Sequence, residues 1–210
     1  LSTGFDLSTA SYAGDGERFL VSQDTIPIDL DFNSDGTKMY VVGWEDNDIH
    51  EYTLTTAFDV STASFVGSFS VSDQDDDPAA LAFSSDGSKM FVTNDTKITE
   101  FTLSNPFDLS NVTSEGREDV SDQITDNKIS GIAFNNDGSK MFIVDSKTGF
   151  TSDIHEYNLT CGFGVKKCID PTSNKDDVAS IESQSEATKK IIQHTTYPVI
   201  NRMEWLRRNS

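Results

Sequence analysis

The chain has few of the residues on which several protein classes depend. Of its 210 residues, two are cysteines and three are histidines, and no cysteine–histidine cluster of the kind that holds zinc is visible. Lys and Arg total 16 against 35 Asp and Glu, which gives a net charge of −19. A surface this acidic repels phosphate backbones, so nucleic acid is not an expected partner. No apolar run approaches the roughly 20 residues that span a bilayer, so we expect no transmembrane segment.

Catalytic and targeting signals are also missing. No serine stands in a Gly-x-Ser-x-Gly elbow, and no signal peptide is visible. The two cysteines, Cys161 and Cys168, stand close enough in the sequence to close a small disulfide loop, which would suit an oxidising compartment. Two free thiols are the alternative. Because the chain starts in mid-repeat, we interpret it as a piece of a longer extracellular or cell-surface protein.

What the sequence does contain is a repeat. The segments Ile28–Leu54, Ala79–Leu103 and Ser130–Leu159 share Phe-x-x-Asp-Gly-x-Lys-Met followed by an Ile-x-Glu-Tyr/Phe-x-Leu stretch. A second shared element, Leu-x-x-x-Phe-Asp, begins at Leu1, Leu54 and Leu103 and returns in a decayed copy at Leu159. The spacing of about 50 residues is typical of propeller blades and exceeds ankyrin or leucine-rich periods.

Each unit predicts four short strands. The first strand is apolar enough to be buried on both sides, an Asp-Gly turn follows, and the later strands are rich in aromatic and β-branched residues. We therefore predict an all-β fold, a β-propeller-like array of four-stranded antiparallel blades with three full repeats plus a partial one, over residues 1–168. Residues 169–210 are predicted to be a linker and an amphipathic helical tail. The repeated Phe5, Phe58, Phe107 and Phe163 are interpreted as packing residues.

These motifs resemble bacterial β-propeller repeats of the YVTN/lactonase-like and WD40-like families. The resemblance covers about residues 1–165 and implies a fold and not an activity, because the Phe-x-x-Asp-Gly element is shared by many propellers. The Trp-Asp ending of a WD40 blade and the Asp-box of sialidases are not present, so no functional residue is carried over. The tail faintly resembles the pre-barrel segment of autotransporter-like surface proteins.

Acidic loops are predicted to gather at one end of the sheets. In an up-and-down meander, the loop that enters the first strand lies beside the loop that joins the second strand to the third. Carboxylate oxygens there suit calcium, and a solvated loop face is the alternative. The candidate metal ligands in the entry loops are Asp24, Asp75, Asp76, Asp77 and Asp126, and the second set of loops holds Glu45, Asp46, Asp48, Asp95, Asp145 and Asp153.

Trp44, Glu45 and Asp46 form a candidate ligand-binding group, since an exposed aromatic beside carboxylates suits a carbohydrate ring. His50 and His155 occupy the same slot in two units, and a metal shared between them is not expected. We expect a secreted or cell-surface, non-catalytic module that binds a protein or glycan and can self-assemble through open blade edges. The alternatives are a metal-dependent, lactonase-like hydrolase and a structural scaffold or stalk.

Overall fold

A computed structural model describes residues 21–74, 76–124, 128–146 and 153–165. By its internal contacts the chain divides into Leu1–Cys168 and Ile169–Ser210. The predicted linker and helical tail fall in the second part, outside the described residues. Within the described ranges the chain is built of β-strands and one 3-10 turn, η3 (Val60–Thr62). No helix in these ranges has the length and apolar character needed to cross a membrane.

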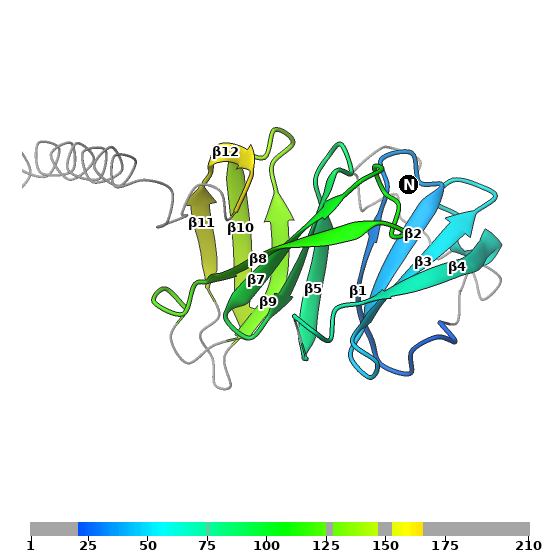
Figure 1. The fold of residues 1–210 in the computed structure, drawn as a ribbon, viewed down its shortest axis with the longest axis horizontal. Coiled ribbons are helices and arrows are strands. Elements are labelled where there is room, and N and C mark those ends of the chain that lie inside the picture. Colours follow the sequence, from blue (N-terminus) through cyan, green and yellow to red (C-terminus); the bar gives the residue numbers. More distant parts are fainter. Residues whose placement is uncertain (1–20, 75, 125–127, 147–152, 166–210) are drawn as a thin grey trace, which may run out of the picture. The chain divides into compact units, whose positions relative to one another are not determined.

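The strands form antiparallel sheets that follow the three repeats (Figure 1). The first sheet has the order β1-β2-β3-β4, the second β5-β6-β7-β8, and the third β11-β10-β9. Neighbouring strands are consecutive in the chain, as in the blades of a propeller. The bounds are β1 Pro27–Phe32, β2 Lys38–Gly43, β3 Asp48–Leu54, β4 Ala63–Ser70, β5 Pro78–Phe83, β6 Lys89–Asn94, β7 Lys97–Leu103, β8 Val112–Asp119, β9 Lys128–Phe134, β10 Lys140–Ser146, β11 Ile154–Asn158 and β12 Thr160–Phe163.

The Asp-Gly turns join the first two strands of each sheet, as predicted. In the second turn, Gly87 has a φ of +71° and the Asp86 carboxylate accepts a hydrogen bond from the Ser88 backbone N–H at 3.0 Å. Glycine adopts this left-handed conformation without the steric cost that a side chain brings. The Ser84 hydroxyl also donates to Asp86, at 2.7 Å, and ties the start of the turn to its centre.

These hydrogen bonds predict a loss of stability in acid. The pKa of Asp86 is lowered from 3.8, first by the Ser84 hydroxyl and then by the Ser88 backbone N–H. The unfolded chain therefore binds a proton more readily than the folded one, so this contribution is complete above pH 3.8 and is lost as the pH falls through the lower folded-state pKa. We expect the urea concentration at the unfolding midpoint to decrease as the pH is lowered below 3.8. The decrease should be less steep in Asp86→Asn. Parallel pH profiles for the two proteins would contradict this.

The first strands of the three units lie side by side, with β5 between β1 and β9 (Figure 1). Of these three strands, only β5 is buried along most of its length. Ile28 and Leu30 of β1 are 45 % and 51 % exposed, and β9 is partly exposed. The expectation that every first strand is buried on both sides is therefore wrong for β1 and β9. The reason is position, since among the described strands only β5 has a first strand of another unit on each side.

The apolar cores form between successive sheets because alternate residues of a strand point to opposite faces. In β6, Met90 and Val92 join the core shared with the first sheet, and Phe91 joins the core shared with the third. The same aromatic contact recurs at both interfaces. The rings of Tyr40 and Phe83 are 4.5 Å apart, and those of Phe91 and Phe134 are 4.4 Å apart. The aromatic residue after Lys-Met therefore packs on the first-strand phenylalanine of the next unit.

A buried glutamate connects each of the first two sheets to the following connector. Glu51 of β3 is 5 % exposed, forms a 2.7 Å ion pair with Lys38, and accepts a hydrogen bond from the Leu109 backbone N–H at 3.3 Å. Lys38 Nζ also donates to the Phe107 carbonyl at 2.7 Å. In the second sheet, Glu100 accepts from the Val165 backbone N–H at 2.9 Å. The repeated Lys and Glu thus connect one unit to the next.

Candidate functional site

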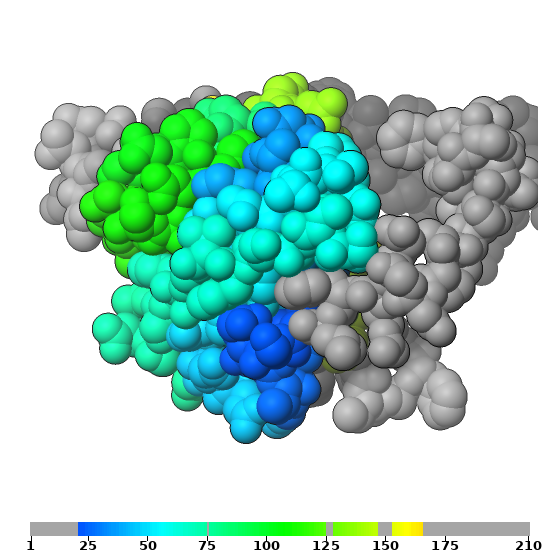
Figure 2. Space-filling model, turned by 90° about the vertical axis from the view of Figure 1, so that its right-hand side faces the viewer, coloured from blue at the N-terminus to red at the C-terminus, as the bar shows by residue number. Residues whose placement is uncertain are grey.

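Where the structure describes them, the entry loops and the loops after the second strands meet at one end of the sheets, as the meander predicts. The backbone N–H of Trp44 donates to the Ile26 carbonyl at 3.1 Å, and the backbone N–H of Ile129 donates to the Asp95 carbonyl at 2.6 Å. The strand register pairs Phe32 with Met39, so the Asp-Gly turns lie at the other end of the strands. In Figure 2, the dark blue atoms of the segment before β1 lie against lighter blue atoms at the lower edge of the first sheet.

A shallow pocket of about 290 Å³ opens between the loops of the three units. Trp44 lines it with an indole that is 47 % exposed. Aromatic rings with one free face offer a flat apolar surface beside a polar edge, which suits a sugar ring. The other residues that line this pocket are Ile28, Asp77, Pro78, Ala79, Asp95 and Lys128.

Lys128 connects the polar groups of this pocket. Its Nζ lies 3.1 Å from an Asp77 oxygen and 2.6 Å from an Asp95 oxygen, and the lysine side chain is 63 % exposed. Hydrogen bonds to Asp95 and then to Asp77 raise the pKa of Lys128, so the ammonium is charged at neutral pH. The result is a rim of two acceptors and one donor beside the indole. The sequence reasoning missed Lys128, although it is the basic residue in an otherwise acidic set of entry loops.

A second group at the same end is formed by Asp24, Asp46 and His50. One ligand atom from each lies within 4.8 Å of the others. Asp24 is 3 % exposed and accepts hydrogen bonds from the backbone N–H groups of Ile26 and, at 3.2 Å, Glu45. His50 is 2 % exposed, and neither of its ring nitrogens has a hydrogen-bond partner.

The third unit contains a related group with a different internal arrangement. Asp145, Asp153 and His155 again lie within 4.8 Å of one another, but His155 Nε2 is 3.1 Å from an Asp145 oxygen and is thus paired. In the middle unit, the repeat alignment puts Asn94 and Thr99 at the places of Asp145 and His155. The three units therefore offer a cluster with an unpaired imidazole, a cluster with a paired imidazole, and a neutral equivalent.

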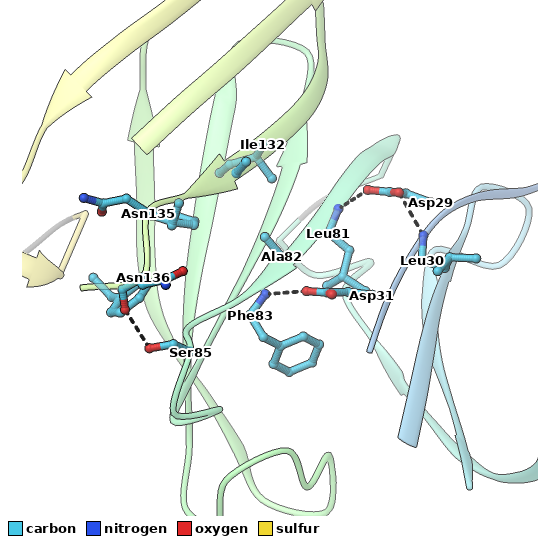
Figure 3. Close-up of a pocket in the computed structure, with 13 residues that line it drawn as sticks. Asp29, Leu30, Asp31, Leu81, Ala82, Phe83, Ser85, Ile132, Asn135 and Asn136 are labelled. Atoms are coloured by element: carbon cyan, nitrogen blue, oxygen red, sulfur yellow. Dashed lines mark hydrogen bonds between the residues drawn. The ribbon is translucent and has the colours of Figure 1, made fainter. Parts of the chain in front are cut away.

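A further pocket of about 380 Å³ lies along the first strands β1, β5 and β9 (Figure 3). Its two carboxylates bind backbone, since Asp29 accepts from the Leu81 N–H and Asp31 from the Phe83 N–H, each at 3.0 Å. Burial is the main cause of a raised pKa at Asp31. These aspartates occupy the positions that Ala80 and Ala82 hold in the next unit, and they join the first two sheets.

The structure places the predicted site residues in separate groups. Of the five candidate calcium ligands, Asp24 enters the histidine cluster, Asp77 binds Lys128, and Asp76 enters neither described cluster, while Asp75 and Asp126 lie outside the described residues. Of the candidate ligand-binding group, Trp44 lines the pocket, Glu45 accepts a hydrogen bond from the Thr25 hydroxyl, and Asp46 joins Asp24.

The predicted disulfide stays a prediction. Cys161 lies in β12, whereas Cys168 lies outside the described residues.

Comparison with known proteins leaves the activity open. No protein-family model and no curated protein matches the chain. Among solved structures, a putative 6-phosphogluconolactonase from Bacteroides uniformis is 12 % identical, with a TM-score of 0.44, and the match covers 63 % of this chain and 40 % of that one. A protein from Lactobacillus plantarum is 16 % identical, with a TM-score of 0.47 and the same two coverages. The β-propeller domain of Cps50 (Swd1) from Myceliophteria thermophila is 13 % identical, with a TM-score of 0.44, over 65 % of this chain and 40 % of that one.

The chain thus spans less than half the length of these neighbours, and at such values the likeness concerns the path of the strands alone. The blade-like order of the sheets and their repeated contacts carry the conclusion. The described part of the chain is an all-β array of β-propeller-type repeats.

Proposed function

We propose that the chain is a secreted or cell-surface, non-catalytic binding module whose acidic loop face takes a glycan. The observation that carries this proposal is the pocket in which the half-exposed Trp44 indole stands beside Asp77, Asp95 and Lys128. An indole face packs on the C–H groups of a sugar ring, while carboxylates accept and an ammonium donates hydrogen bonds to its hydroxyls.

The chemistry of the pocket favours binding over catalysis. Lys128 contacts both carboxylates, so each already has a cationic partner. None of the described residues that line the pocket is a serine, cysteine or histidine. The net charge of −19 repels anionic glycans, so neutral and amino-sugar oligosaccharides are the proposed ligands. Self-assembly through open sheet edges stays a prediction.

Tryptophan fluorescence tests the proposal. In a Trp205→Phe background, which leaves Trp44 as the reporter, we expect saturable quenching by a neutral or amino-sugar oligosaccharide and none by a sulfated one. Trp44→Ala should weaken binding at least about tenfold, measured by calorimetry, because the stacking surface is lost.

Ile154→Ala is the matched control, since Ile154 is a 74 % exposed apolar side chain that does not line the pocket. Its affinity should equal that of the parent. A panel in which no neutral or amino-sugar oligosaccharide changes the signal would overturn the glycan proposal, and so would equal affinity in Trp44→Ala.

A further inference from the structure

The cluster around His50 has a polar side chain that nothing in its own surroundings satisfies. The imidazole is 2 % exposed, and both Nδ1 and Nε2 lack a hydrogen-bond partner. A buried polar atom without a partner is costly, so such groups in native proteins usually meet a partner of some kind. The carboxylates of Asp24 and Asp46 lie close to His50, with one oxygen of each within 4.8 Å of an imidazole nitrogen and of the other oxygen.

The Asp24 carboxylate is held in place before anything binds. It is 3 % exposed and fixed by backbone N–H groups on both sides of the junction between the entry loop and the loop after β2. Gly43 makes room for it, because a Cβ there would stand 1.9 Å from an Asp24 oxygen. At the equivalent places the other units have Asn94 and Asp145. Asp24 thus supplies from a loop the oxygen that Asp145 supplies from strand β10.

The Asp46 carboxylate adds a second negative charge at the mouth of the cluster. Its side chain is exposed, and one of its oxygens lies within 4.8 Å of an Asp24 oxygen. Two carboxylates that face each other without a cation repel each other, and a cation between them reverses that interaction.

We propose that Asp24, Asp46 and His50 form a binding site for a divalent transition metal, with Zn²⁺ as the expected ion. One imidazole nitrogen and two carboxylate oxygens are a donor set that zinc accepts, whereas calcium selects oxygen ligands. Calcium at Asp24 stays a prediction from the sequence, and the imidazole of His50 is the reason to expect zinc at this cluster instead. Three protein ligands leave a fourth position for water or for an oxygen of a bound partner.

Comparison with the other two units identifies control variants that should leave zinc binding at the Asp24, Asp46 and His50 cluster unchanged. His155 already has a partner in Asp145, and the middle unit has Asn94 and Thr99 instead of acid and imidazole. The first unit therefore holds the strongest zinc site. His155→Gln and Glu45→Gln are matched controls, the first for a histidine in the same slot and the second for the carboxylate next to Asp46.

Calorimetric titration of the metal-free full chain with Zn²⁺ tests the site, read together with long-range ¹H–¹⁵N spectra of the histidine side chains. We expect Zn²⁺ to shift the His50 ring nitrogens, and Asp46→Asn to weaken that site at least about tenfold while the fold is kept, because Asp46 is exposed. Both control variants should bind as the parent does. Unshifted His50 nitrogens at saturating Zn²⁺, or parental affinity in Asp46→Asn, would overturn the proposal. Neither result bears on Trp44, so the glycan proposal fails or stands separately.

Discussion

Replacing Glu100 by alanine is expected to lower the free energy of unfolding by about 3 kcal/mol, whereas the same change at Glu156 should lower it by less than about 1 kcal/mol. Both residues stand at the same place in the repeat, and each forms an ion pair with the lysine of its own unit. The large difference is expected because their surroundings differ.

Glu100 is 1 % exposed, and its partners include Lys89 and the Val165 backbone N–H. Its removal leaves a largely buried ammonium and a buried backbone donor without an acceptor, and each of these is costly. The Glu156 side chain is 48 % exposed and that of its partner Lys140 is 43 % exposed, so water replaces the lost interaction. Exposed pairs of this kind contribute little.

Urea unfolding of the two alanine variants at pH 7, followed by circular dichroism, measures the difference. Both variants remove the same side-chain atoms from a β-strand, Glu100 from β7 and Glu156 from β11. Equal destabilisation of the two variants would mean that the buried glutamate does not connect the second sheet to the connector that carries Val165.

Gly87→Ala is the second change with a large expected effect, a loss of about 2–4 kcal/mol of stability. Gly87 has a φ of +71°, which an alanine adopts only with strain. A Cβ at this position would also stand 2.1 Å from the ring of Phe107. The Phe107 backbone N–H donates a hydrogen bond to the Gly87 carbonyl at 3.0 Å. The Phe107 ring also packs on Phe83, with ring centroids 5.5 Å apart, so moving it away would disturb that contact.

Gly67→Ala is the control, because a Cβ there has no atom within 4 Å and the φ of Gly67 is outside the left-handed region. We expect it to change stability by less than about 1 kcal/mol in either direction. Thermal unfolding of both variants, followed by calorimetry, separates the two cases. Similar melting temperatures for them would contradict the packing of Phe107 on the turn.

The repeated motif made much of the fold predictable, because its residues have local conformational preferences. The Asp-Gly pairs predicted the turns at residues 35–36, 86–87 and 137–138, and alternating apolar residues predicted the strands beside them. The packing role predicted for Phe107 and Phe163 is confirmed, because both are partly buried against the cores. Phe58 also lies against its turn glycine but is 58 % exposed, and Phe5 lies outside the described residues. The repeated Glu was not explained by the sequence, since its backbone partner comes from the next unit.

The candidate sites were less predictable from the sequence than the fold. In the sequence, His50 and His155 occupy the same position of the repeat, and Asp24 lies in an entry loop. The local sign that Asp24 and His50 belong to one cluster is Gly43, which stands where the other units have Asn94 and Asp145.

Taken by itself, the sequence determined the repeats and the positions of the strands and turns, because these depend on neighbours along the chain. Only the tertiary structure decided that Asp24 faces His50 across the space left by Gly43, that Lys128 meets Asp77 and Asp95, and that β5 alone of the described first strands is buried. Those contacts join residues from different loops and units. They depend on how the sheets pack, which no local pattern specifies.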